Sequence, residues 1–471
     1  QTLDNWTAIY RPALLPDYQA DMQAHADAPR YSLDLWLAVS ENDATITGQQ
    51  TVLYTNRTSV TLNEVVFRLY PNLDSYGGEM IVSGISADGF AVQPTLDGTR
   101  SIMTVPLPQP LPAGASISFA MAFEITVQAD VVALYGQFGY LNGVLALPNA
   151  YPMLAVYENG PGWWNETAHP QGDIVFSETA FYDVRITAPS HLLIATSGSA
   201  VGMSANGDGT LTHQFVAPLM RDFMLTASDN FVTLNGVQDG VRITLYYDAT
   251  SPASATSARS GLQIAQDTLR IFNATFGAYP FSELDIVQTP NGAGGMEYPG
   301  LFVLDSTTWD TDPAFLEFLL VHETAHQWWY SLVGSDQARD PWMDEALAQF
   351  SVAVYIRAQE GNDAYTTALE SFRAQHASYI TDHPDQRIGG PVSDYQGLAY
   401  FNMVYQKGPL FYAALDDLYG YDTVILVLRD YFAAYRYRIA YPGDLRASLE
   451  ASLGADLSAV FAEWVAPLPV G

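Results

Sequence analysis

The chain has 471 residues, with 51 acidic and 19 basic side chains and a formal net charge of −32. Such a surface repels phosphate backbones, which argues against nucleic acid as a partner. The absence of cysteine excludes disulfides, thiolate catalysis and Cys-rich zinc sites. With 48% hydrophobic residues and no apolar run near the roughly 18 residues that span a bilayer, we expect a soluble globular protein without a transmembrane segment.

The first half of the chain is dominated by strand-like patterns. From about Tyr31 to Phe231, apolar and polar residues alternate in runs such as 31–37, 116–123 and 182–187, and turns rich in Gly, Pro, Asn and Asp separate these runs. Alternation with a period of two is typical of strands that bury one face. We therefore predict an antiparallel β domain over residues 1–230.

Beyond residue 230 the pattern becomes helical. After one further strand over residues 241–247, a helix is predicted from Ala255 to Phe276, and helical patterns continue as far as an amphipathic segment over residues 444–464. The sequence thus predicts an α+β fold, in which the N-terminal β domain is followed by a mainly helical domain over residues 231–471.

The most informative stretch is Val321-His-Glu-Thr-Ala-His-Gln-Trp-Trp-Tyr330, which lies in an apolar segment predicted to be helical. His322 and His326 are four residues apart, so on a helix both imidazoles share one face and can bind the same tetrahedral Zn²⁺. Glu323 lies beside the first ligand and can act on a zinc-activated water. The alternative is a pair of hydrogen-bonded core histidines, but the chain has only eight histidines and the pattern is rare by chance.

A third zinc ligand is expected from the next helix. After a loop over residues 334–340, Pro341-Trp342 begins a new helical pattern, and Glu345 follows His326 with eighteen residues between them. A carboxylate is a suitable ligand, and three protein ligands leave the fourth position of zinc open. Taken alone, Glu345 could simply complement the dipole at the start of a helix. Its spacing from the histidine pair favours the ligand.

These residues resemble the aminopeptidase N (membrane alanyl aminopeptidase) family of gluzincin zinc metallopeptidases. That family combines His-Glu-x-x-His, eighteen residues and Glu with an upstream Gly-x-Met-Glu-Asn motif and a downstream Tyr-x-Lys-Gly motif. This sequence reads Gly294-Gly-Met-Glu-Tyr298 upstream and Tyr405-Gln-Lys-Gly408 downstream, in the same order and at similar spacing. Tyr298 replaces the family's Asn. The chain resembles a short form, since the family's C-terminal helical domain has no counterpart after residue 471.

The resemblance implies a thermolysin-like catalytic domain with one zinc ion per chain. Carried over position by position, His322, His326 and Glu345 would hold the metal, and Glu323 would be the general base. The same roles follow from zinc chemistry, because a carboxylate beside the metal can take a proton from water and return it to the leaving amine.

The other two motifs imply the residues that bind substrate. Glu297 would bind the free α-amine of the peptide, with Gly294 and Gly295 along the peptide path, and Tyr405 would stabilise the oxyanion. We therefore predict a zinc-dependent aminopeptidase that acts on peptides with a free N-terminus.

Two alternatives stay open at this point. One is a zinc endopeptidase of the same fold with weakened amine recognition, and the other is a non-catalytic peptide-binding protein. A chain rich in aspartate that carries a single lysine, Lys407, favours an extracytoplasmic or secreted location. The sequence carries no signal of oligomeric state.

Overall fold

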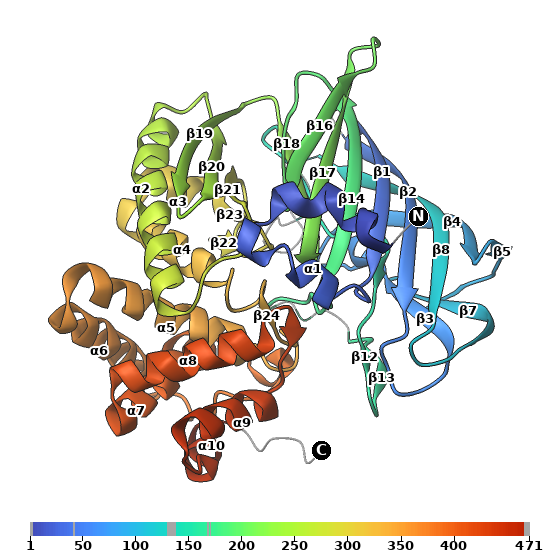
Figure 1. Ribbon diagram of the computed structural model, residues 1–471. Helices are drawn as coiled ribbons and strands as arrows, with labels where there is room; N and C mark the ends of the chain where they lie inside the picture. The colour runs from blue at the N-terminus through green and yellow to red at the C-terminus, as the bar shows by residue number, and fades with distance from the viewer. Residues whose placement is uncertain (1–2, 41–42, 130–137, 167–168, 170, 466–471) are drawn as a thin grey trace. The chain divides into compact units, whose positions relative to one another are not determined.

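The computed structural model describes residues 3–40, 43–129, 138–166, 169 and 171–465. It groups into two compact units, the first drawn from residues 1–166, 177–262 and 280–313, and the second from residues 167–176, 263–279 and 314–471. Strands dominate the first unit and helices dominate the second (Figure 1). The expected α+β fold class is confirmed, whereas a domain boundary at residue 230 stays a prediction.

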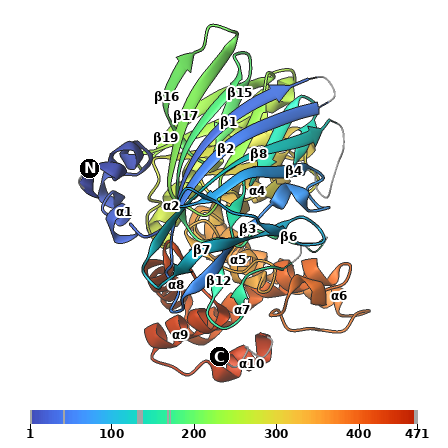
Figure 2. The same cartoon turned by 90° about the vertical axis from the view of Figure 1, so that its right-hand side faces the viewer.

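Eight strands form the main sheet of the first unit. Their spatial order is β16 (Ser199–Ala205), β17 (Thr210–Met220), β14 (Ala180–Pro189), β1 (Arg30–Val39), β2 (Asp43–Thr55), β8 (Ser116–Gln128), β4 (Glu79–Ala87) and β5 (Phe90–Ala91). Burial alternates strictly along most of β1, β2 and β8, as the alternating sequence predicts for strands with one buried face. Figure 2 shows β1, β2 and β8 running side by side.

One pairing in this sheet departs from the antiparallel pattern, because β1 and β14 run parallel. An ion pair crosses them: Arg185 Nε lies 2.5 Å from Asp34 Oδ1, and Arg185 Nη2 lies 3.2 Å from Asp34 Oδ2. The two residues share one register position of the pairing. The pairing therefore joins segments that are far apart in the chain.

Two four-stranded sheets and a hairpin also belong to the first unit. One sheet has the order β15 (Leu193–Thr196), β18 (Met224–Ser228), β10 (Val144–Pro148) and β9 (Gly139–Leu141). The other has the order β11 (Met153–Leu154), β3 (Leu62–Arg68), β7 (Ile102–Leu111) and β6 (Thr95–Leu96). The hairpin consists of β12 (Tyr157–Glu158) and β13 (Gly162–Trp163).

A five-stranded sheet also belongs to the first unit, in the order β19 (Phe231–Gln238), β20 (Val241–Asp248), β21 (Glu283–Thr289), β23 (Leu301–Asp305) and β22 (Gly295–Met296). The sequence predicted only one strand beyond Phe231, over residues 241–247. The strands β20, β21 and β23 run parallel to one another. The strand β23 is short and reads Leu-Phe-Val-Leu-Asp, so buried apolar residues follow one another without alternation in polarity. A short apolar run of this kind cannot be told from a buried helical turn.

The first unit also contains short helices near its N-terminus, η1 (Leu3–Ala13), η2 (Pro16–Tyr18) and α1 (Asp21–Ala24), and two more at η3 (Tyr70–Asn72) and α3 (Ser306–Thr311). The long helix α2 (Pro252–Thr275) matches the helix predicted from Ala255. Its residues up to 262 group with the first unit and those from 263 with the second.

The second unit is built from α4 (Pro313–Ala325), α5 (Trp342–Glu360), α6 (Asn362–Tyr379), η5 (Val392–Asp394), the π-helix η6 (Phe401–Lys407), α7 (Gly408–Tyr419), α8 (Tyr421–Tyr435), α9 (Pro442–Leu453) and α10 (Ser458–Trp464). A small parallel pair joins β24 (Val333–Gly334) to β25 (Arg438–Ile439). The segment 444–464 is thus two helices, because Gly454 adopts a left-handed conformation at φ 62° and ends α9.

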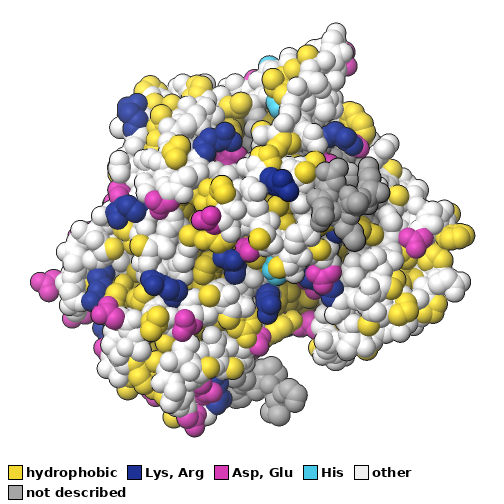
Figure 3. All heavy atoms as spheres, in the orientation of Figure 1, with side chains coloured by type: hydrophobic (Ala, Val, Ile, Leu, Met, Phe, Trp, Pro, Cys, Tyr) yellow, Lys and Arg dark blue, Asp and Glu magenta, His cyan; other side chains and the backbone are white. Residues whose placement is uncertain are grey.

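One face of the molecule shows how its acidic side chains are distributed. On the face shown in Figure 3, acidic side chains lie scattered among uncharged atoms rather than gathered into one patch. Across the described residues, no helix combines the length and the apolar character that crossing a membrane requires.

Candidate active site

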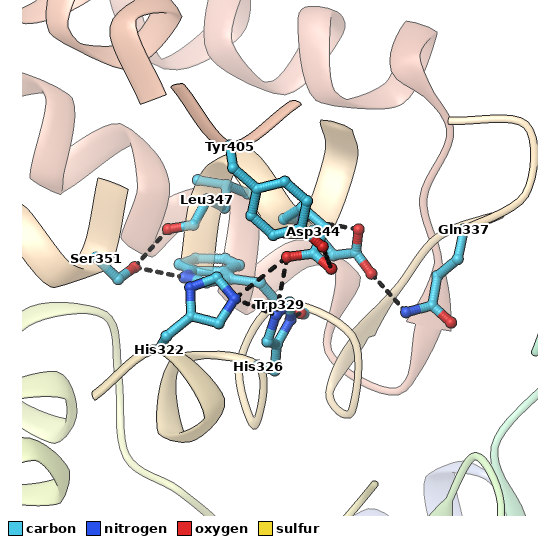
Figure 4. A network of polar contacts seen from close by, with 9 residues as sticks. His322, His326, Trp329, Gln337, Asp344, Leu347, Ser351 and Tyr405 are labelled. Atoms are coloured by element: carbon cyan, nitrogen blue, oxygen red, sulfur yellow. Dashed lines mark hydrogen bonds and ion pairs between the residues drawn. The ribbon is translucent and has the colours of Figure 1, made fainter. Parts of the chain in front are cut away.

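The helix α4 presents the two histidines of the motif on one face. Its sequence is free of Gly and contains Pro only at its first position, so nothing interrupts the helix before Ala325. The backbone N–H of His326 donates to the carbonyl of His322 at 3.3 Å, which extends the helical turn to the second histidine. The Nε2 atoms of His322 and His326 lie 3.2 Å apart (Figure 4).

The chain reverses sharply after His326. Ser331 N donates to His326 O and Val333 N donates to Trp328 O, each at 2.9 Å, and Tyr330 adopts a positive φ of 137°. A non-glycine residue seldom adopts this conformation, which costs free energy and persists only where the surroundings enforce it. Because the chain reverses at this turn, the next helix, α5, can return to the two histidines.

The helix α5 brings Glu345 to the histidine pair. Pro341 precedes its first residue, and Glu345 lies in its first turn. Glu345 Oε2 is 3.2 Å from His322 Nε2 and 3.3 Å from His326 Nε2. All three side chains are buried. The structure thus brings the three predicted zinc ligands together in the second unit, with one candidate ligand atom each.

The spacing of these three atoms fits a tetrahedral metal ion. Zinc binds histidine nitrogen and carboxylate oxygen at about 2.0–2.2 Å, and the edge of a tetrahedron is about 1.63 times that bond length, or about 3.3–3.6 Å. Of the three observed separations, the 3.3 Å one equals the lower limit of this range and the two of 3.2 Å lie about 0.1 Å below it. A borderline-soft ion with two nitrogen ligands and one oxygen ligand matches the donor set.

Hydrogen bonding fixes the protonation of the second histidine. His326 Nδ1 lies 2.9 Å from the carbonyl oxygen of Trp329. A carbonyl can only accept, so Nδ1 carries a proton, and Nε2 of the same ring faces His322 and Glu345. A backbone carbonyl that orients a metal-binding histidine in this way is a common feature of metal sites.

Electrostatics keep Glu345 ionised. Burial alone raises the pKa of its carboxyl, but the adjacent His326 and His322 outweigh burial and hold the pKa well below its usual range. The second carboxylate oxygen, Oε1, accepts a hydrogen bond from the hydroxyl of Tyr405 at 2.6 Å. Oε2 of Glu345 therefore faces the two histidines and can bind a cation, while Tyr405 holds Oε1 in place.

Tyr405 lies on the π-helix η6 and contacts the site through its phenol. Burial, with the negative charge of Glu345 as the next cause, raises the pKa of Tyr405 well above its usual value. The phenol therefore keeps its proton at neutral pH and can act as a hydrogen-bond donor. A π-helical turn is uncommon and frequently marks a functional site.

Trp329 ties the histidine turn to α5. Its indole Nε1 donates to Ser351 Oγ at 3.0 Å, and Ser351 Oγ donates to the carbonyl of Leu347 at 2.7 Å (Figure 4). The same residue orients His326 through its carbonyl. The sequence did not indicate this second role, because every residue carries a carbonyl and only the turn shows which one faces the imidazole.

A second polar contact that the sequence did not indicate lies next to Glu345. Gln337 Nε2 donates to Asp344 Oδ2 at 2.8 Å, and the backbone N–H of Glu345 donates to Asp344 Oδ1 at 2.8 Å. Asp344 is 1% exposed. This buried carboxylate ties the loop before α5 to the first turn of the helix that carries Glu345.

The remaining predicted residues lie on α4 and in the first unit. Glu323 is a buried residue of α4 in the second unit. Gly294, Gly295 and Glu297 belong to the first unit, where Gly295 begins β22 and Glu297 follows it as a buried carboxylate. Gly294 has φ 93°, a backbone conformation that favours glycine. This conformation is enough to explain why glycine occupies the position. The roles of these four residues stay predictions.

Tyr298, which replaces the family's Asn, belongs to the core of the first unit. It is 5% exposed and packs in a cluster with residues that include Val287, Leu301 and Val303. The substitution therefore places a large side chain in a hydrophobic core beside the buried Glu297.

Comparisons with known proteins agree with this arrangement. Residues 260–464 match the peptidase family M1 domain. Leucyl aminopeptidase of Saccharolobus solfataricus is 22% identical over 242 residues, which cover 49% of this chain and 31% of that protein. Endoplasmic reticulum aminopeptidase 2 of Homo sapiens is 25% identical over 237 residues, which cover 47% of this chain and 24% of that protein. The chain therefore spans a quarter to a third of the length of these relatives.

Solved structures match over almost the whole chain. An M1 zinc metallopeptidase from Deinococcus radiodurans superimposes with a TM-score of 0.70 at 20% identity, covering 94% of this chain and 96% of that one. A mutant of the Deinococcus radiodurans enzyme bound to a Tyr-Ser-Ala substrate gives a TM-score of 0.69 at 20% identity and covers 94% of this chain and 95% of that one. At this level of identity the match shows a shared fold.

Proposed function

Since this chain belongs to peptidase family M1 through residues 260–464, we propose that it is a zinc-dependent aminopeptidase that removes the N-terminal residue of peptides. The observation that carries the proposal is the buried triangle of His322, His326 and Glu345, whose facing atoms are 3.2–3.3 Å apart. Aminopeptidases among the relatives favour this activity over other hydrolytic reactions.

The metal is zinc, held one per chain by these three side chains. Support comes from the buried donor set and from the zinc metallopeptidases that share the fold. When bound, zinc lowers the pKa of a water molecule toward neutrality and polarises a carbonyl group.

Glu323 is assigned the proton transfers. It is a buried carboxylate on the same helix as the two histidines and next to the first of them. Such a group can accept the proton of the attacking water and pass it to the amine that leaves when the peptide bond breaks. The side chain is thus a base in the first half of the reaction and an acid in the second.

Tyr405 is assigned the stabilisation of the carbonyl oxygen. Its phenol is protonated at neutral pH, half-buried, and held 2.6 Å from Glu345 Oε1. A donor whose ring is already held beside the reacting group stabilises negative charge on a nearby oxygen more strongly than mobile water does. The phenol has a single proton, which Glu345 Oε1 accepts in the resting site, so the hydroxyl turns from Glu345 to the carbonyl oxygen during the reaction.

Glu297 is assigned the recognition of the α-ammonium group. It is a buried carboxylate within the segment that matches the family. A protonated amine offers a buried carboxylate both positive charge and hydrogen-bond donors. Gly294 and Gly295, which precede it, would leave room along the peptide path.

A zinc endopeptidase is the second candidate function. One observation favours it: Tyr298, packed in the core, stands where the family motif has Asn, so the amide that adjoins the amine-binding glutamate in relatives is missing here. Endopeptidase activity requires the same zinc chemistry without a free α-amine in the substrate.

A comparison of matched substrates tests the proposal. The chain is incubated with an aminoacyl-arylamide and with the same compound acetylated on its amine, while zinc content is measured by mass spectrometry. An aminopeptidase cleaves only the free form, with one zinc per chain. Cleavage of internal bonds in blocked peptides at a similar rate would favour the endopeptidase, and zinc binding without any hydrolysis would leave only a peptide-binding protein.

A further inference from the structure

The segment that carries Tyr405 has an unusual backbone that needs support from its surroundings. Residues 401–407 form the π-helix η6, whose hydrogen bonds span five residues instead of four. Such a turn accommodates one more residue than an α-turn, and one residue of an α-helix corresponds to a rotation of about 100°. If η6 relaxed toward an α-helix, the direction of the Tyr405 side chain would change.

The inner side of this segment is fixed by close packing on α5. A Cβ atom built on Gly408 would lie 2.6 Å from the Cβ of Ala346, the residue after Glu345. Only glycine allows so close an approach without displacing α5. Tyr405 itself is surrounded by the rings of Tyr400 and Phe401, each with its centroid 5.7 Å away.

The outer side is fixed by Lys407, the single lysine of the chain. Its Nζ donates to Asp385 Oδ1 at 2.7 Å and to the carbonyl of Gln386 at 2.6 Å. Asp385 Oδ1 is also 3.3 Å from His376 Nε2 on α6. The lysine side chain is 12% exposed and that of Asp385 is 49% exposed, so the pair is shielded from water on the lysine side only.

We propose that Lys407 is a positioning residue, which holds η6 in its π conformation and so keeps the phenol of Tyr405 directed at Glu345. The inference rests on the proposed function, in which Tyr405 acts on the carbonyl oxygen. The observed contacts of Lys407 are with Asp385 and Gln386 and not with the predicted zinc ligands. Lys407 therefore acts by fixing the orientation of Tyr405. Displacing a donor in an active site by about 1 Å can reduce the rate up to about 10²-fold.

A purely structural role for the ion pair makes a different prediction. Loss of a stabilising contact lowers Tm but leaves kcat of the folded molecules unchanged. Loss of positioning lowers kcat with little change in KM, because the affected contact matters mainly in the transition state. The two roles are therefore separated by kinetics at a temperature well below Tm.

The kinetic test compares Lys407→Met with Lys407→Arg in the full chain. We expect Lys407→Met to lower kcat about tenfold with KM within twofold and zinc content unchanged, and Lys407→Arg to recover most of the loss. The control is Arg373→Met, which removes another ion pair of the second unit, with Asp417 at 3.5 Å, and should leave kcat unchanged.

A double variant shows whether the effect passes through Tyr405. In the Tyr405→Phe background, Lys407→Met should lower kcat no further, because the group that it positions is already missing. A full tenfold loss in that background, or an unchanged kcat in the single variant, would overturn the proposal.

Hydrogen exchange supplies a readout that does not depend on activity. In the zinc-loaded protein, Lys407→Met should speed amide exchange in peptides covering residues 401–408 at least severalfold, whereas Arg373→Met should not. Unchanged exchange in this segment would reject Lys407 as its support. If the wild type hydrolyses neither free nor blocked substrates, the proposed function fails, and the exchange result still decides whether Lys407 holds η6.

Discussion

Replacing Tyr405 by Phe removes one hydroxyl from the site and keeps the ring. The hydroxyl is 2.6 Å from Glu345 Oε1 and remains protonated at neutral pH. Removal of a single donor from an oxyanion site costs about 2.7–4 kcal/mol, which corresponds to about 10²–10³-fold in kcat. We expect kcat to fall by this factor, with little change in KM, because the donor acts mainly in the transition state.

The same substitution also affects the resting protein. Glu345 Oε1 loses a donor in a buried place, and hydrogen bonds to charged groups contribute about 1.5–3 kcal/mol. Tm should therefore fall by several degrees while the zinc content stays near one per chain. Steady-state kinetics with an aminoacyl-arylamide, mass spectrometry of the metal and calorimetry measure the three quantities.

Tyr412→Phe is the matched control. Its buried hydroxyl has no hydrogen-bond partner among the described residues, so removing it costs little. An unchanged kcat for Tyr405→Phe, or an equal loss for both variants, would refute the assignment of Tyr405 to the reaction.

Further predictions concern the general base, the zinc ligands, recognition of the substrate amine and the packing of η6 on α5. Glu323→Gln should abolish hydrolysis while zinc stays bound, and retained turnover would reject its role as base. Alanine at any of the three ligands should instead lower zinc affinity, measured by competition with a chelator. Glu297→Ala should raise KM for free-amine substrates and reduce the preference for them over amino-blocked ones; an unchanged KM for free-amine substrates would contradict amine binding. Gly408→Ala should destabilise the protein by about 1–3 kcal/mol in denaturant titrations, since its Cβ would lie 2.6 Å from another; an unchanged midpoint would show that the helices can separate there.

The histidine pair was predictable from the sequence because its geometry is local. Helical periodicity alone places His322 and His326 on one face, and a helix without internal Gly or Pro preserves that spacing. Glu345 was also predictable, because Pro341-Trp342 marks the start of its helix in the sequence. The three side chains come together because the turn that joins the two helices is compact.

The elements that the sequence did not indicate depend on distant contacts. The π conformation of η6 requires Asp385 beside Lys407 and Ala346 beside Gly408, and neither neighbour can be inferred from local pattern. The strand β23 was not predicted because burial on both faces removes the alternation of polar and apolar residues that marks a strand.

The parallel pairing of β1 with β14 has a consequence for how the chain folds during synthesis. The paired residues Asp34 and Arg185 are 151 positions apart, so at about 5–20 residues per second β1 waits about 8–30 s for its partner. Its antiparallel neighbour β2 follows directly and can pair at once, which leaves the other edge of β1 with open backbone groups. Non-local pairings of this kind slow folding. This edge of β1 therefore stays open to pairing with other chains until β14 emerges from the ribosome.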